Sequence, residues 1–345
     1  MTSSEFTFNL LFRHFGRDTD EEWEVIEPYF AEYWKSAVEP LRSKTYDHNG
    51  CSIKVTVDWS PYVRRIIHYH NIMGPVRKGQ TNNEEWYAKI NRPLRLKATC
   101  ILTGSNKLSE YTWYPEFFLE YYLYEIFAIS NLACPGAADF YGLTIESKTT
   151  KSTDRPRLSA FYFDEWMIES VRGRQPCARM LNPEAVARWF SAVNPDVTQK
   201  ADNATQRAIF ALYHLCKSDG HIDFVLWLFN ALETLLSTRV GENFTGLVRR
   251  VALVLELNAA ESKAMSKRLR KLYDLRSAFV HGGYDVPHPI HSEPIDERIS
   301  EQYENVLQLS TYGFILFASL LQRMIETNRT VFVFEENLVG GAIAN

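Results

Sequence analysis

The chain has 345 residues, of which 46% are hydrophobic, 14% aromatic and 23% charged. This length exceeds the usual size of one hydrophobic core, and this composition is typical of folded rather than disordered proteins, so we expect two folded domains. The formal net charge of -4 excludes a protein that binds polyanions through a global basic excess, so any such contact must be local.

The cysteines, the N-terminal segment and the most apolar segment indicate where in the cell the protein is expected. The five cysteines are widely separated and contain no CxxC pair, which argues against a disulfide framework and a zinc ribbon. The N-terminal segment lacks the apolar core of a signal peptide. The most apolar stretch, residues 117–138, is interrupted by Glu120, Glu125 and Pro135, which favours a buried helix over a membrane span. We therefore expect a cytoplasmic protein without a membrane partner.

The first half of the chain is predicted to be α+β. Residues 21–38 have helical periodicity, whereas residues 51–58 (CSIKVTVD) and 93–103 (PLRLKATCILT) are rich in β-branched residues and partly alternate, as strands do. A third strand is predicted at residues 160–168 (AFYFDEWMI), which follow a polar loop.

From about residue 183 the pattern becomes helical throughout. Short connections containing Gly and Asn predict antiparallel neighbours, as in a helical bundle. The predicted domains are an α+β sensor or regulatory domain at 1–195, an all-α bundle at 196–330 and a tail at 331–345. The predicted helices span residues 183–193, 205–216, 223–237, 244–257, 260–280 and 296–325.

One arginine interrupts an apolar seam in the helix predicted at 260–280. Met265, Leu269, Leu272, Arg276 and Phe279 follow one another at spacings of four, three, four and three residues, which is typical of a packed helix face. An unpaired guanidinium on such a face is costly, so we expect an anionic partner for Arg276.

The same helix is predicted to end at His281, because Gly282 and Gly283 can supply a left-handed cap and a Pro-rich loop follows. His281 is therefore expected at a helix end that ligands can reach. The spacing of Arg276 and His281 is not diagnostic alone, since Arg207 and His214 share a similar one.

The helix predicted at 223–237 is apolar except for one polar stripe, which includes Asn230 and Glu233. We expect Glu233 to face Arg276 and hold its guanidinium, with Asn230 toward a cleft; the alternative is that this stripe faces solvent. A charged-group separation beyond about 6 Å would exclude the pairing.

Basic residues precede the Arg276 motif. They are candidates for contacts with phosphate groups, although solvated helix faces carry similar clusters. Tyr273 is a candidate for stacking on a base, with a packing role as the alternative. The basic candidates are Lys263, Lys267, Arg268, Arg270 and Lys271, with Arg249 and Arg250 on the preceding helix.

Residues 230–283 resemble the Apea-like branch of the HEPN superfamily. The resemblance is carried by ALETLL at 231–236 and by YDLRSAFVHG at 273–282, which matches the family pattern YDxRSxxVHG, and it covers about the last 150 residues. Residues 117–140 are more weakly similar to sensor-like regions that precede such domains. The resemblance implies a helical domain that forms a homodimer, so that two R-x4-6-H motifs meet in one cleft and cleave RNA without metal. Several such proteins act in bacterial defence against phage.

The residue types suit that chemistry. RNA carries its own nucleophile, the 2′-OH, so cleavage needs a base, an acid and a cation for the phosphorane. Two copies of His281 can divide the acid and base roles, and Arg276 can hold the phosphate oxygens. Glu233 and Ser277 complete the predicted catalytic set, Ser277 as a phosphate ligand or as a hydrogen-bond partner of the backbone. Lys267, Arg268, Arg270, Lys271, Tyr273 and Asn230 form the predicted RNA-binding set.

The predicted function is thus a cytoplasmic, metal-independent HEPN endoribonuclease of anti-phage defence, abortive infection or toxin-like growth arrest. It needs no cofactor, and a phage-derived trigger would act on the first domain. His288 and His291 form an HPIH segment, but no cysteine or regular carboxylate spacing supports a metal site there. The alternatives are a non-catalytic HEPN module that dimerises or binds RNA or protein, and an antitoxin-paired helical protein.

Overall fold

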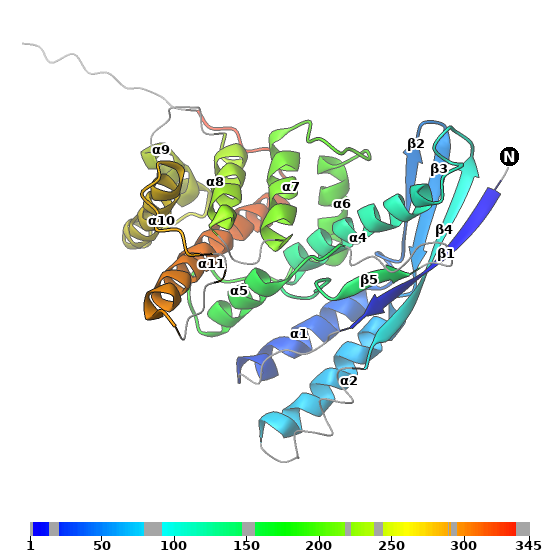
Figure 1. Ribbon diagram of the computed structural model, residues 1–345, viewed down its shortest axis with the longest axis horizontal. Coiled ribbons are helices and arrows are strands. Elements are labelled where there is room, and N and C mark those ends of the chain that lie inside the picture. Colours follow the sequence, from blue (N-terminus) through cyan, green and yellow to red (C-terminus); the bar gives the residue numbers. More distant parts are fainter. Residues whose placement is uncertain are drawn as a thin grey trace, which may run out of the picture.

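An antiparallel sheet lies at one end of the molecule, and helices extend from it toward the other end (Figure 1). The computed structural model of the chain describes residues 3–13, 21–78, 92–146, 156–217, 222–237, 244–288, 290 and 295–335. The sheet has the strand order β2-β3-β4-β1-β5. Its strands are β1 Ser3–Phe12, β2 Ser43–His48, β3 Cys51–Val57, β4 Leu94–Gly104 and β5 Leu143–Glu146.

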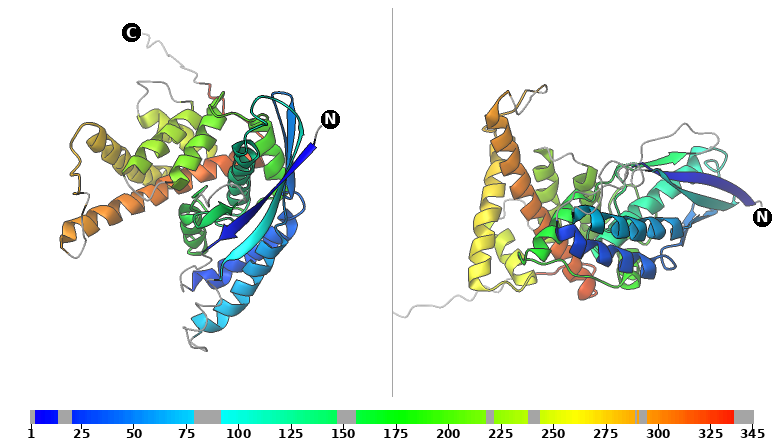
Figure 2. Two further views of the ribbon diagram at one scale, coloured as in Figure 1. Left: turned by 45° about the vertical axis from the view of Figure 1, so that its right-hand side comes forward. Right: turned by 90° about the horizontal axis from the view of Figure 1, so that it is seen from below.

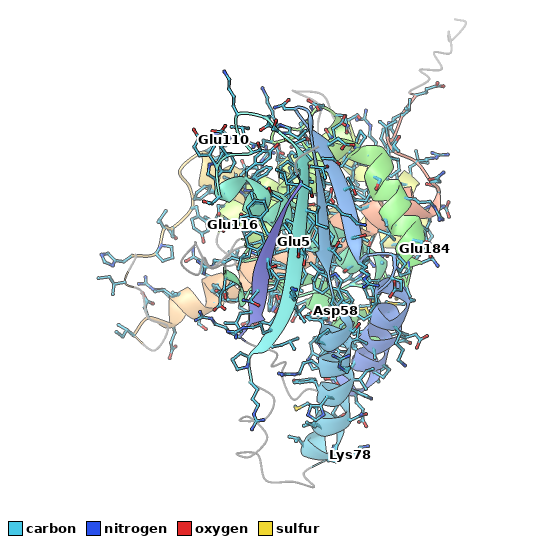
Figure 3. All side chains as sticks on the ribbon, turned by 90° about the vertical axis from the view of Figure 1, so that its right-hand side faces the viewer. Glu5, Asp58, Lys78, Glu110, Glu116 and Glu184 are labelled. Atoms are coloured by element: carbon cyan, nitrogen blue, oxygen red, sulfur yellow. The ribbon has the colours of Figure 1, made fainter. Side chains whose placement is uncertain are left out.

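The sheet buries one face and exposes the other. Leu10 of β1 and Ile53 and Val55 of β3 are completely buried, because alternate side chains of a strand point to the same side. Helix α4 (Trp113–Ala133) packs against β3 and β4 on this buried side. Figure 3 looks onto the opposite face, where Glu5 is exposed.

Apart from α5 and α6, which lie between them, the remaining helices form two groups. Helices α1 and α2 pack against each other beside the sheet, whereas α7 to α11 occupy the far end (Figure 1). The bounds are α1 Glu22–Ala37, α2 Ser60–Arg77, α5 Phe161–Val171, α6 Pro183–Val193, α7 Ala204–Lys217, α8 Asp223–Leu235, α9 Phe244–Val254, α10 Ala259–Val280 and α11 Glu297–Glu326.

One hydrophobic core runs through both halves of the chain. Helix α11 packs on α8, α9 and α10 and also reaches α4 and α5, while α6 packs on α4 and α1. The rings of Phe163 on α5 and Phe314 on α11 lie 4.9 Å apart in an edge-on contact. The domain boundary near residue 195 remains a prediction, and the packing is continuous across it.

The α+β class and most predicted elements are confirmed, but the strand predicted at 160–168 is wrong. This segment forms helix α5, in which Tyr162, Phe163, Trp166 and Met167 are buried at helical spacing. The aromatic residues that suggested a strand are there because a buried helix also needs large apolar side chains. Strands β1, β2 and β5 and helix α2 were not predicted.

The segment from α6 onward contains only helices among the described residues. Each predicted helix from 183 to 325 is confirmed within three residues at its ends. In the tail, residues 331–335 have no regular structure, although Phe332 is buried.

Candidate functional site

Helices α8 and α10 meet on α11 at a glycine. A Cβ atom on Gly313 of α11 would clash with Cδ2 of Leu228 on α8 and Cδ2 of Leu272 on α10. Both leucines are completely buried, so the absence of a side chain at Gly313 lets the three helices approach one another. This packing places the C-terminal part of α8 beside the C-terminal part of α10, where the predicted site residues lie.

Glu233 on α8 and Arg276 on α10 form an ion pair. The Arg276 Nη1 atom donates a hydrogen bond to Glu233 Oε1 at 2.8 Å. The guanidinium also lies 5.2 Å from the centre of the Phe229 ring, one turn earlier on α8. The predicted pairing is confirmed, and α8 supplies both the anion and an aromatic surface for the arginine.

The buried part of the apolar seam of α10 ends before Arg276. Met265, Leu269 and Leu272 are buried, whereas the Arg276 side chain is 30% exposed and that of Glu233 38% exposed. The pair is therefore fixed at the rim of the core rather than inside it. A guanidinium in this position keeps N–H groups available to a ligand from solvent.

His281 ends α10 as predicted. Its backbone N–H donates to the Ser277 carbonyl at 2.9 Å, and Gly282 adopts a left-handed conformation with φ +76. The Gly283 N–H donates to the Ala278 carbonyl at 2.7 Å and closes the cap. The His281 residue is exposed, and its imidazole has no hydrogen-bond or ion-pair partner among the described residues.

Arg276 and His281 do not share one face of the helix. A separation of five residues corresponds to a rotation of about 140° in an α-helix. Within one chain the structure pairs Arg276 with Glu233, and no hydrogen bond or ion pair joins His281 to either residue.

The basic residues of α10 divide into two kinds. Lys267 and Lys271 are exposed and project from the helix surface. The guanidinium of Arg268 lies 4.9 Å from the centre of the Tyr312 ring, and that of Arg270 lies 3.9 Å from the Phe244 ring. Both arginines are exposed as well, so their charged groups remain accessible while their contacts limit where they can move.

Arg250 does not belong to an exposed basic stripe. It is buried, and its Nη1 atom donates to the carbonyls of Leu236 and Ser237 at 3.0 Å each. It therefore caps the C-terminal end of α8, where helix carbonyls need donors. Arg249 next to it is exposed and remains a candidate for phosphate contacts.

Tyr273 packs against its own chain. Its ring centre lies 5.7 Å from that of Phe229 and 5.2 Å from that of Phe244, and the residue is half-buried. These contacts agree with the second role considered for Tyr273, packing within its own chain, rather than with stacking on a base. Ser277 is half-buried, with its carbonyl in the helix cap, and Asn230 is exposed on α8.

Exposed apolar side chains surround the end of α10. Helix α10 and the N-terminal end of α11 lie at the edge of the molecule farthest from the sheet (Figure 2). Val280, immediately before His281, and Val286, Ile290 and Ile295 in the following loop are all exposed. Several exposed apolar residues in one segment are typical of a surface that another protein covers.

Neither a metal cluster nor a membrane span is present in the described ranges. No group of three or more His, Cys, Asp or Glu residues is placed there to hold a metal ion. His288 is exposed, and its Nδ1 accepts from the backbone N–H of Ile290, while His291 lies outside the described residues. None of the helices between residues 3 and 335 that the structure describes is both long and apolar enough to cross a bilayer.

No protein-family model, curated protein or solved structure matches this chain. Sequence reasoning missed Gly313 and the Phe229 contact. A glycine inside the strongly apolar helical run YGFILFASLL was the available signal for a close helix approach.

Proposed function

We propose that this protein is a metal-independent endoribonuclease of the HEPN type, whose catalytic site is completed by a second copy of the chain. The observation that carries the proposal is the Arg276–Glu233 pair at the rim of the core, one and a half turns before an exposed histidine that ends the same helix. The sequence resemblance supplies the reaction class.

Each residue has a distinct role in the proposed reaction. One His281, in its neutral form, takes the proton of the 2′-OH, and the 2′-oxygen attacks the adjacent phosphorus. The bond to the 5′-oxygen breaks, and the other His281, in its protonated form, gives that oxygen a proton. The products are a 2′,3′-cyclic phosphate and a 5′-OH. Arg276 stabilises the negative charge of the phosphorane, and Glu233 orients its guanidinium.

A dimer fits the geometry of the single chain. Arg276 and His281 point about 140° apart on one helix, so a phosphate held by one arginine would meet a histidine of the partner. The exposed Val280, Val286, Ile290 and Ile295 would be covered by that partner. The sheet-bearing half would hold the nuclease inactive until a trigger, such as a phage component, is sensed.

The test is cleavage of single-stranded RNA by the purified full chain in the presence of EDTA. We expect cleavage products that end in a cyclic phosphate, and a loss of at least about a hundredfold in rate for His281→Ala. His288→Ala is the matched control, because it removes another exposed histidine, from the loop that follows His281. Equal cleavage by His281→Ala and the parent protein would disprove the catalytic assignment.

A second candidate is a non-catalytic HEPN module. The contacts of Arg276 with Glu233 and Phe229 favour it, because they explain an arginine on an apolar seam without any reaction. In this case Arg276→Ala lowers the free energy of unfolding and leaves the growth of cells that express the protein unchanged. Relief of growth arrest by His281→Ala, with unchanged unfolding, supports the ribonuclease instead.

A further inference from the structure

An exposed aromatic stack lies on the same helix as Glu233. The ring of His214 on α7 lies against that of Trp227 on α8, with 3.9 Å between ring centres and 3° between planes. His214 is exposed, and Trp227 is 36% exposed. A parallel contact this close covers one face of the indole and fixes the plane of its ring. The exposed area of Trp227 therefore belongs to the opposite face and to the edges of the ring.

The stack and the Glu233–Arg276 pair lie at the two margins of one helix face. Trp227, Asn230 and Glu233 follow one another at intervals of three residues, so they are neighbours on the surface of α8. Each interval falls about 60° short of a full turn, and the three side chains occupy an arc of about 120°. Helix α8 lies between α7 and α10 (Figure 1). We call this face, from His214 to Arg276, the α8 strip.

The polar groups of the α8 strip can meet a ligand from solvent. The structure records no hydrogen bond for the Trp227 indole N–H or for the Asn230 amide among the described residues, and Asn230 is exposed. At the other margin, the Arg276 side chain is 30% exposed beside its bond to Glu233. A flat ring, an amide that both donates and accepts, and a guanidinium suit a base, the polar edge of that base and a phosphate.

The length of the strip fits a single nucleic-acid strand. Glu233 is six residues after Trp227, which is about 9 Å along the helix axis. A stacked strand advances about 3.4 Å per nucleotide, so this length corresponds to about two or three nucleotides. A strand whose phosphate contacts Arg276 can therefore place a nearby base on Trp227. A base inside a duplex cannot stack there, because its neighbours cover both of its faces.

We propose that Trp227, backed by His214, stacks on an unpaired base of RNA, and that Asn230 forms a hydrogen bond with the edge of that base. The inference rests on the proposed ribonuclease function, because the phosphate at Arg276 positions the strand. It names the substrate class: RNA that is single-stranded next to the cleaved bond. Every base has a face that can stack, so the contact with Trp227 tolerates any sequence, and any preference among bases comes from Asn230.

The test is fluorescence anisotropy of the full chain with a short labelled RNA, used as a single strand and as a duplex. Every protein carries His281→Ala, so that the RNA remains intact. We expect the single strand to bind more tightly than the duplex. Trp227→Leu should raise the Kd for the single strand about five- to a hundredfold, because it removes the stacking ring. Asn230→Ala should raise it about three- to tenfold.

Two variants control for the loss of a large side chain. Trp227→Phe keeps an aromatic ring and should restore most of the affinity that Trp227→Leu loses. Trp113→Leu is the matched control, because it removes an even more exposed tryptophan, 49% accessible, from the start of α4. In the cleavage assay with His281 intact, Trp227→Leu should raise the KM and keep kcat within about threefold, as expected for a lost binding contact. A folding defect would instead lower kcat through the active fraction.

Equal affinity of Trp227→Leu and Trp113→Leu for the single strand, or tighter binding of the duplex, would overturn the proposal. A sedimentation coefficient that changes with Trp227→Leu while the RNA affinity does not would also overturn it, and would assign the α8 strip to contact between protein chains. RNA cleavage by the parent chain, with a Kd that does not depend on Trp227, would refute this inference alone. Binding that depends on Trp227, in a chain that cleaves no RNA, would refute the ribonuclease and retain the base contact.

Discussion

The ion pair of Glu233 and Arg276 allows a direct separation of catalysis from stability. We consider Glu233→Gln, which keeps the size of the side chain, Arg276→Gln, which shortens it and removes the charge, and the double variant. The charged atoms are 2.8 Å apart, but both side chains are about one third exposed. Solvent screening therefore limits the coupling free energy to about 0.5–1 kcal/mol, as for other exposed pairs.

The expected loss of stability is small and the expected loss of activity is large. A change of about 1 kcal/mol shifts the melting temperature of a chain of this size by only about 1–3 °C. Loss of a guanidinium that stabilises transition-state charge costs about a hundred- to a thousandfold in rate. Glu233→Gln, which leaves Arg276 in place but less well oriented, should cost about tenfold or more.

The measurements are urea unfolding of all four proteins, for the double-mutant cycle, and initial rates of RNA cleavage for the same set. The reasoning is refuted if Arg276→Gln lowers the free energy of unfolding by about 3 kcal/mol or more while cleavage persists. That combination is expected of a buried structural pair, not of one at the rim.

Three further predictions concern the scaffold. Gly313→Ala should lower the free energy of unfolding by about 1–2 kcal/mol, because a Cβ atom only 2.4 and 2.6 Å from two buried leucine carbons costs about 2–3 kcal/mol and the gain in helix propensity offsets about 1 kcal/mol. An unchanged urea midpoint would contradict the close packing. Arg250→Met should lower it by about 2–3 kcal/mol in the same assay, since two carbonyls lose a charged donor, and should leave RNA affinity in a filter-binding assay unaltered. Burial lowers the pKa of His214 below its ordinary value of 6.5, so the unfolded chain binds its proton first. Stability should therefore fall as the pH decreases below 6.5, and His214→Gln should flatten that part of the pH profile of the melting temperature, whereas an identical profile would exclude His214 as its source.

The helices of the second half could be predicted because their information is local. The seam of α10, the glycines after His281 and the polar stripe of α8 each lie within a few turns of one helix. The Glu233–Arg276 pair could also be predicted, since a charge on an apolar seam requires a partner and α8 offered one carboxylate on its polar stripe. Physical cost, rather than sequence spacing, carried that prediction.

The sheet was harder to predict because its pairing is not local. Phe8, Leu10 and Phe12 of β1 are buried in strict alternation. This alternation is visible in the sequence, so the strand itself could have been predicted, although it was not. Its neighbours in the sheet could not be predicted, since β1 pairs with β4 and β5 from far along the chain. The prediction of a strand at 160–168 was wrong for another reason. Strands and buried helices are both rich in aromatic residues, and only the spacing of the buried positions distinguishes the two.

The pocket between α4 and α7 could not be predicted from the sequence for the same physical reason. Phe117 and Tyr124 come from α4, Phe210 and Tyr213 from α7, and Thr198 from the connection between helices. Each pair of aromatic residues looks like ordinary core on its own helix. Only the packing of α7 on α4 turns them into two walls.

The interior position of β1 in the sheet delays its pairing while the chain is being synthesised. Its partner β4 begins about ninety residues later, and a ribosome adds about 5–20 residues per second, so β1 waits about 5–20 s for that partner. During this interval an apolar strand has both edges unpaired and can bind other nascent chains. The helices that carry Arg276 and His281 are translated later still. A cell that makes this protein therefore completes all five strands of the sheet before α8 and α10 are available to pack on each other.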